Sequence, residues 1–135
     1  MDAVLVATVG AEPQVVTLAT DLLLRQAPLT RVIVLHTDAQ YPPIDRALPA
    51  LRTAWSARAD LPPLTCAPVA VADILTPSDF EHFADALFDL LKREIAAAHC
   101  VHLLLAGGRK SMALVGMSVA QLLLGAHDRA WYLHS

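Results

Sequence analysis

The chain has 135 residues, of which 56% are hydrophobic and 17% are charged, and its formal net charge is -3. A chain of this length can bury a sizeable core, and so apolar a composition excludes intrinsic disorder. The negative charge argues against binding of polymeric DNA or RNA, which depends on many Lys and Arg contacts to phosphates. A small anionic ligand held by a few local donors remains compatible with it.

The apolar residues also bear on location and assembly. No apolar stretch reaches the roughly 18 residues that a membrane span needs, and the first residues lack a secretory signal, so we expect a cytoplasmic protein without membrane contact. We expect one domain over residues 1–135, and the apolar excess favours a subunit interface. Cys66 and Cys100 are expected to be unpaired core thiols, because disulfides do not persist in a reducing compartment.

The chain opens with an apolar run at residues 3–8, which predicts a buried strand. Pro13 then takes the favoured first position of a helix that extends to about residue 26. A second apolar run at residues 31–36 predicts another buried strand. Next comes an amphipathic helix, in which Pro49 is an unfavourable interior residue. Its predicted apolar face consists of Ile44, Leu48, Leu51 and Trp55.

A weaker strand is predicted at residues 64–71, where Pro68 favours a sheet edge or a bulge. Ser78 with Glu81 fits a capping box at the start of a long third helix that reaches about residue 95. This half of the chain therefore continues the alternation of strand and helix.

The most apolar run, residues 101–106, predicts a fourth strand. A helix from about Lys110 to residue 124 follows and ends at Gly125, and residues 130–134 predict a last strand. Five strands alternating with four helices indicate an α/β fold: a Rossmann-like, doubly wound, mainly parallel sheet of five or more strands with helices on both faces. Ligands of such sheets bind beyond the carboxyl ends of the strands, where the strand order reverses.

Two loops at that edge are chemically distinctive. The loop after the first strand contains Gly10, which can adopt backbone conformations that other residues avoid, and it leads into a helix N-terminus that favours an anion. A tight strand-to-helix turn explains this loop equally well. Glu12 would repel a phosphate there unless it faces a hydroxyl or a base.

The loop before the fourth helix combines glycines, which allow a ligand close to the backbone, with two of the chain's ten cations and a hydroxyl. A glycine turn followed by a solvated basic pair is the structural alternative. The residues concerned are Gly107, Gly108, Arg109, Lys110 and Ser111. The loop is not a Walker A motif, because Leu104 and Arg109 stand where that motif needs glycine.

No G-x-G-x-x-G fingerprint follows either strand, and the six His and two Cys lack the spacing of a zinc site. We therefore expect neither a metal nor a cofactor. His36 and Thr37 end the second strand at the ligand edge, where they can reach a base or a ribose. A structural, hydrogen-bonded His36 is the alternative.

Residues 8–17 and residues 107–112 together resemble the two signature segments of CRISPR-associated Rossmann-fold (CARF) domains, and residues 127–129 resemble the usual ending of that family. The resemblance covers essentially the whole chain. The most similar members are the CARF ring nucleases and the sensor domains of type III CRISPR accessory effectors.

This resemblance implies a homodimer whose strand-end loops form one pocket for a cyclic oligoadenylate, most often the tetra-adenylate. Residues 107–111 would cradle the phosphates. The opposite wall and the remaining contacts would come from Thr8, Gly10, Ala11, Glu12, Gln14, His36, Thr37 and Met112. Relatives often carry Ser at the position of Glu12, which leaves Thr8 as the alternative hydroxyl.

The family mechanism is attack by a ribose 2′-hydroxyl on the neighbouring phosphodiester, which gives a 2′,3′-cyclic phosphate without metal and switches off signalling. Lys110, backed by Arg109, would stabilise the developing charge. No residue is an obvious general base, so turnover would be slow. Two alternatives stay open: a non-catalytic sensor from a longer effector, and a small Rossmann-like enzyme or scaffold for an unrelated phosphorylated ligand.

Overall fold

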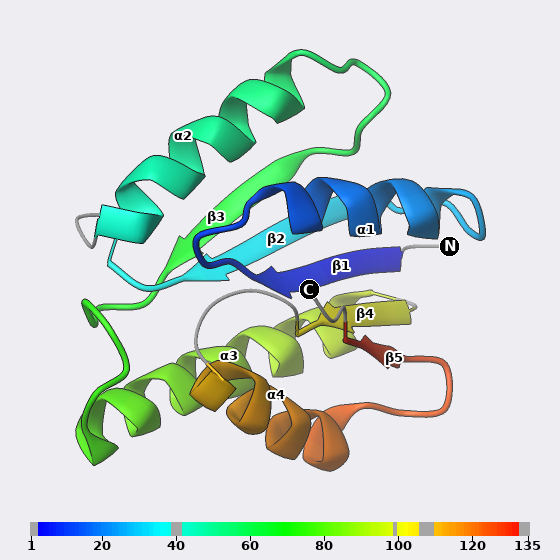
Figure 1. Ribbon diagram of the computed structural model, residues 1–135. Coiled ribbons are helices and arrows are strands. Elements are labelled where there is room, and N and C mark those ends of the chain that lie inside the picture. The colour runs from blue at the N-terminus through cyan, green and yellow to red at the C-terminus, as the bar shows by residue number, and fades with distance from the viewer. Residues whose placement is uncertain (1–2, 39–41, 99, 106–109, 133–135) are drawn as a thin grey trace.

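The computed structural model describes residues 3–38, 42–98, 100–105 and 110–132. In chain order its elements are β1 (Ala3–Thr8), α1 (Gln14–Leu24), β2 (Arg31–His36), α2 (Pro42–Ser56), β3 (Leu64–Pro68), α3 (Pro77–Ala97), β4 (Cys100–Leu104), α4 (Lys110–Leu123) and β5 (Arg129–Trp131). These strands pair in parallel in the order β3-β2-β1-β4-β5 (Figure 1). The predicted doubly wound, Rossmann-like α/β fold is confirmed.

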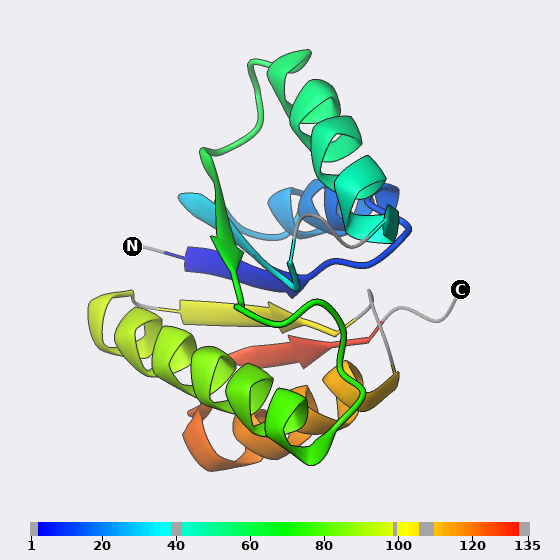
Figure 2. The same ribbon diagram turned by 90° about the vertical axis from the view of Figure 1, so that its left-hand side faces the viewer.

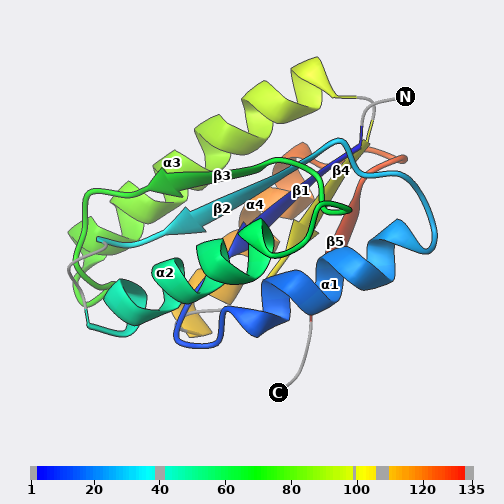
Figure 3. The same cartoon turned by 90° about the horizontal axis from the view of Figure 1, so that it is seen from above.

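The helices form two layers, one on each face of the sheet. α1 and α2 cover one face, and α3 and α4 cover the other (Figure 1 and Figure 2). Figure 3 looks down onto the layer of α1 and α2, with the sheet beneath it. The chain runs from β1 outward to β3 and then returns to the other side of β1. Because each crossover is right-handed, this return places the second pair of helices on the opposite face.

β1 lies in the middle of the sheet and is buried along its whole length. Successive side chains of a strand point to opposite faces, so one apolar run supplies two cores. Val4 and Val6 belong to the cluster on the α3–α4 side, whereas Leu5 and Ala7 belong to the cluster beneath α1 and α2. The burial on both faces that the continuous apolar pattern predicted is confirmed, and each buried Val or Leu contributes about 1.5–3 kcal/mol.

α2 packs on the sheet through the apolar face that the sequence predicted. The four buried residues of this face are Ile44, Leu48, Leu51 and Trp55. The indole N–H of Trp55 also donates to the carbonyl of Pro62 at 2.7 Å. Pro49 lies inside the helix, on its exposed side, without ending it. The buried face therefore outweighs the roughly 3 kcal/mol that an interior proline costs.

The start of α3 differs from the prediction of a capping box at Ser78 and Glu81. The box joins Thr76 and Asp79 instead. The Thr76 hydroxyl accepts from the N–H of Asp79 at 3.1 Å, and the Asp79 carboxylate accepts from the N–H of Thr76 at 3.0 Å. Pro77 follows in the first turn, where its missing N–H costs nothing. The predicted start was wrong because a capping box also fits two residues earlier, and only that earlier start places Pro77 in the first turn.

Thr76→Ala is expected to lower the free energy of unfolding by about 1 kcal/mol, because the N–H of Asp79 loses its acceptor. Ser78→Ala, the matched control in the same turn, is expected to change it by less than about 0.5 kcal/mol. Urea denaturation followed by circular dichroism measures both variants. Equal losses in the two variants would contradict the assigned cap.

The same box makes the stability of the fold depend on pH. Hydrogen bonds from the N–H groups of Leu75 and Thr76 lower the pKa of Asp79. A carboxyl with a lowered folded pKa stabilises the fold above its unfolded pKa, and this stabilisation is lost as the pH falls through the folded value. Asp79→Asn is therefore expected to destabilise at pH 7 and to do so less below about pH 4. Urea titrations at both pH values test this, and a pH-independent loss would contradict it.

The predicted boundaries shift by a few residues. α1 begins at Gln14, with Pro13 as its N-cap rather than its first helical residue. β3 ends at Pro68, before its predicted end, and forms one edge of the sheet, as this proline indicated. β5 begins at Arg129, one residue earlier than predicted, and residues 133–134 lie outside the described ranges. Main-chain pairing thus sets strand ends that the apolar runs alone left imprecise.

Candidate functional site

The strand order reverses between β1 and β4. β1 pairs with β2 on one side and with β4 on the other. The chain leaves β1 for α1 on one face and leaves β4 for α4 on the opposite face (Figure 1). Connections that diverge in this way leave room for a ligand beyond the carboxyl ends of the two strands. The segment after β1 and the start of α4 both lie at this edge of the sheet.

The segment after β1 contains both buried and exposed members of the predicted ligand wall. Thr8, the last residue of β1, is 1% exposed, and Gly10 is buried as well. The exposed members are Ala11, Glu12 and Gln14. In this arrangement the exposed residues can meet a ligand from solvent, whereas the Thr8 side chain lies within the packed interior.

α1 begins at this edge without a side-chain cap. Its N-cap, Pro13, supplies no acceptor, and no acidic residue lies in the first turn. The N–H groups of Val15 and Val16 donate to the carbonyls of Glu12 and Pro13 at 3.3 and 3.1 Å. The helix dipole adds partial positive charge, which favours an anion, but the nearby exposed carboxylate of Glu12 opposes one. The start of α4 is therefore the better position for a phosphate.

α4 begins with a cation in an electrostatically unfavourable place. Lys110 is its first residue, and the side chain is exposed. A positive charge at a helix N-terminus opposes the helix dipole at a cost of about 0.3–1 kcal/mol, so helix stability does not explain it. A bound anion would interact favourably with both the ammonium group and the N–H groups of the first turn. Among the described residues, Lys110 points most directly to an anion site.

The rest of the predicted phosphate-binding segment is only partly described. Gly107, Gly108 and Arg109 lie outside the described ranges, and Ser111 belongs to the first turn of α4. Met112 is 2% exposed and packs into the cluster on the α3–α4 side of the sheet. The structure gives Met112 a packing role. A contact with a ligand would require its side chain to leave that core.

His36 and Thr37, at the end of β2, are both buried. Nδ1 of His36 lies 2.6 Å from the carbonyl oxygen of Thr37. A carbonyl only accepts, so Nδ1 carries the proton and donates it to this bond. The backbone is fixed as well, because the N–H of Val69 donates to the His36 carbonyl and the N–H of Asp38 donates to the Val71 carbonyl. The buried, hydrogen-bonded state of His36 agrees with the alternative in which this histidine has a structural role.

A polar cluster on β4 and β5 was not predicted as a unit. The indole N–H of Trp131 donates to Nδ1 of His102 at 3.0 Å, so Nδ1 is unprotonated. Sγ of Cys100 lies 3.5 Å from Nε2 of the same imidazole. Burial lowers the pKa of His102 and raises that of Cys100, so both groups are held neutral. The sequence does contain an indication of this cluster: Cys100 and His102 are two residues apart, which places them on one face of the strand.

Cys100 lies at the amino end of β4, away from the ligand edge. Like Cys66, it is free and half buried, so the predicted thiols are unpaired but only partly within the core. Within the described part of the chain, no three His, Cys, Asp or Glu side chains converge as metal ligands do. Over the same ranges, none of the helices has the length and apolar character needed to cross a membrane.

Comparison with known proteins identifies a family. A family model described as CRISPR-associated protein NE0113 (Cas_NE0113) matches residues 56–135, which is more than half of the chain. The matched part runs from the last residue of α2 to β5 and beyond, so it includes Lys110 and the segment before it. The segment after β1 lies outside the match. No curated protein matches the chain.

Proposed function

The chain belongs to the family of CRISPR-associated protein NE0113, and from this membership and the geometry of the strand-end edge we propose that it binds a cyclic oligoadenylate, with cyclic tetra-adenylate favoured. Its role is CRISPR-related. In the proposal, residues 1–135 act as one domain of the CARF type, and two copies enclose one ligand. The bound ring is then opened, which ends the signal that it carries.

One observation carries this proposal: the exposed Lys110 begins α4 beside the reversal of strand order. A cyclic oligoadenylate presents one phosphate per nucleotide, and a cation at a helix N-terminus is suited to such a group. Gly107, Gly108 and Arg109 remain part of the proposed phosphate cradle. On the β1 side of the same edge, exposed polar groups can face ribose hydroxyls and base edges, which avoids the repulsion between Glu12 and a phosphate.

The proposed chemistry is an internal transfer within the ligand. A bond forms between a ribose 2′-oxygen and the adjacent phosphorus while the bond from that phosphorus to the 5′-oxygen breaks. The 2′-hydroxyl releases its proton, and the departing 5′-oxygen takes one up, so no water is consumed. The protein bends the ligand until the attack is in line and stabilises the charge that develops on the phosphate. Lys110 supplies this stabilisation, with Arg109 as the second cation.

α4 also offers the apolar surface that the proposed homodimer needs. Leu114, Met117 and Leu122 are 68%, 45% and 75% exposed. Exposed apolar side chains gathered on one helix favour a protein–protein contact. Leu114 lies about one helical turn after Lys110, so contact between two copies of α4 at this position would bring both lysines to one ligand.

A sensor that binds the ring without opening it is the second candidate, and the state of His36 favours it. This imidazole donates its Nδ1 proton to the Thr37 carbonyl and is 3% exposed, so a ribose hydroxyl has little access to its unprotonated Nε2. It is therefore poorly placed to take a proton from a ribose hydroxyl. In this candidate the same edge and the same cations hold the ligand, and a partner domain responds to it.

Isothermal titration with cyclic tetra-adenylate and with linear tetra-adenylate tests the binding step that both candidates share. We expect the cyclic ligand to bind more tightly, at one ring per two chains, because a closed ring matches a two-fold pocket. Equal binding of both ligands, or binding of neither, would contradict the proposal. Equal binding would favour the third reading, a Rossmann-like protein for another phosphorylated ligand.

A further inference from the structure

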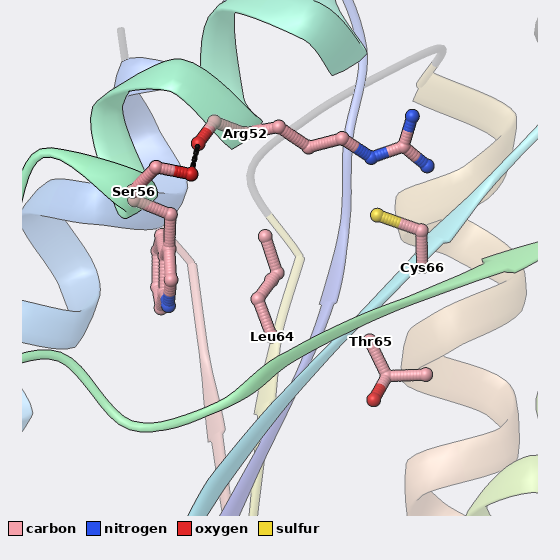
Figure 4. A pocket seen from close by; sticks show the side chains of 6 residues that line it. Arg52, Ser56, Leu64, Thr65 and Cys66 are labelled. Atoms are coloured by element: carbon pink, nitrogen blue, oxygen red, sulfur yellow. Dashed lines mark hydrogen bonds between the residues drawn. The ribbon is translucent and has the colours of Figure 1, made fainter.

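A cavity of about 570 Å³ lies between α2 and the edge strand β3, away from the point between β1 and β4 where the strand order reverses. Arg52, Trp55 and Ser56 line it from α2, and residues 64–66 line it from β3. In Figure 4 the side chain of Arg52 extends from the helix across the cavity toward Cys66. The side chains of Leu64 and Cys66 face α2, and Thr65 points to the other side of the strand.

Arg52 is an exposed cation on α2. Among the described residues its guanidinium forms neither an ion pair nor a side-chain hydrogen bond. The next arginine along the chain differs: Arg58 pairs with Asp21 at 2.7 Å and with Asp60 at 2.6 Å. A planar guanidinium at the mouth of a cavity is well suited to a carboxylate, which it can bind through two parallel bonds.

The strand beneath Arg52 has a free edge, and its ladder to β2 fixes which groups lie there. The N–H of Val32 donates to the carbonyl of Pro63 at 2.9 Å, and the N–H of Val69 donates to the carbonyl of His36 at 2.8 Å. In a parallel pair these bonds recur at every second residue of each strand. Odd-numbered residues of β3 therefore direct their N–H and C=O groups toward β2, and even-numbered residues direct theirs outward.

Leu64 and Cys66 thus present their N–H and C=O groups along the outer edge of the sheet. Pro68 falls on the same side, where its missing N–H interrupts no bond to β2. Two outward donors, with a cavity and a cation directly above them, form a short site for strand addition.

We propose that this site binds an extended acidic segment of a partner protein, which adds to β3 as a further strand and places a carboxylate on Arg52. The backbone of the partner pairs with the outer groups of Leu64 and Cys66. An apolar side chain of the segment occupies the part of the cavity lined by Trp55 and Leu64. The occupant is identified by its chemistry: an extended backbone with a carboxylate on the α2 side.

A second copy of this chain is a poor occupant. Two copies that paired antiparallel through β3 about a two-fold axis would carry both α2 helices on the same face of the joined sheet. In that arrangement the strand that pairs with β3 brings no carboxylate to the edge beneath Arg52, since residues 64–68 contain none. A strand of a different protein can supply this carboxylate directly, and we assign the occupant to such a protein.

The test uses the whole chain and two synthetic peptides in NMR titrations with amide hydrogen exchange. They are acetyl-Thr-Val-Thr-Glu-Thr-amide, whose Val and Glu side chains share one face of an extended strand, and its Gln-for-Glu counterpart. We expect the Glu peptide to slow exchange at the amides of Leu64 and Cys66, while Thr65 and Ala67, which already face β2, do not change. Arg52→Gln is expected to weaken binding of the Glu peptide about tenfold. Arg46→Gln, an exposed arginine on the same helix outside the cavity, is the matched control.

Each other outcome overturns the proposal in a distinct way. Absence of binding at millimolar Glu peptide would mean that the edge takes no acidic strand. Binding that depends on Arg52 without protection of the two amides would mean that the cavity holds only a small anion. Protection of these amides at high protein concentration without peptide would make the occupant a second copy. Equal affinity of the Glu and Gln peptides would remove the role of charge.

Discussion

Lys110→Gln is expected to weaken binding of cyclic tetra-adenylate by about 1–3 kcal/mol while leaving thermal stability unchanged or slightly raised. The ligand loses a charge-assisted contact at the start of α4, whereas the helix loses a cation that opposed its dipole. Isothermal titration and calorimetric melting of the same preparations measure the two effects. A stability gain combined with an affinity loss distinguishes a binding residue from a structural one.

The chain provides a matched control, because Lys92 is its only other lysine. Lys92 is exposed on α3 and changes the net charge by the same amount when replaced with Gln. We expect Lys92→Gln to bind the ligand like the parent protein. If the two variants lose affinity equally, the effect is one of net charge, and Lys110 does not contact the phosphate. Arg109→Ala is expected to act in the same direction as Lys110→Gln.

The double variant Leu114→Glu, Leu122→Glu is expected to convert the proposed dimer into monomers. Each leucine is more than two thirds exposed in the isolated chain, and its burial in an interface would contribute about 1.5–3 kcal/mol. Two charges on this face should therefore raise the dimer dissociation constant by at least about 100-fold. Opening of the ring should be lost as well, because half of the pocket is missing. Sedimentation velocity, with and without cyclic tetra-adenylate, measures the assembly.

Leu75→Glu is the control for this variant, since Leu75 is equally exposed but lies between β3 and α3 rather than on α4. It should leave the dimer intact. A parent protein that sediments as a monomer at all concentrations, with and without ligand, would remove the symmetric pocket. A double variant that remains dimeric would move the interface away from α4.

The elements with strong local patterns were predicted well. The continuous apolar runs identified β1 and β2 as strands buried on both faces, and helical spacing identified the four residues that α2 buries. The start of α3 was misplaced because two overlapping segments fit a capping box, and only one of them puts Pro77 in the first turn. The sequence contains Pro77, and proline favours the first turn of a helix, so the start at Thr76 could have been predicted.

The candidate site was harder to predict because burial depends on partners distant in the chain. The sequence places Thr8 and His36 at the correct edge, but their burial follows from packing between neighbouring strands. Met112 is different: it precedes the buried Val115 and Val119 at helical spacing, so its core position was readable. Its predicted contact with the ligand came from the family resemblance and stays a prediction.

The cavity beside Arg52 was not predictable from local patterns. It exists because α2 and β3, joined by residues 57–63, pack against each other with a free strand edge beneath the helix. Arg52 looks in the sequence like any solvated helix residue. The structure adds that β3 is an edge strand, so the charge of Arg52 lies above backbone groups that can pair with another strand.

Incubation of the protein in EDTA with cyclic tri-, tetra- and hexa-adenylate shows whether it opens a ring, when the products are followed by liquid chromatography and mass spectrometry. We predict that one ring, with the tetra-adenylate favoured, is lost to linear fragments that end in a 2′,3′-cyclic phosphate. Lys110→Gln should slow this loss. A ring that stays intact while co-eluting with the protein would contradict cleavage and make the chain a sensor. Rings that neither bind nor open would contradict the proposed ligand itself.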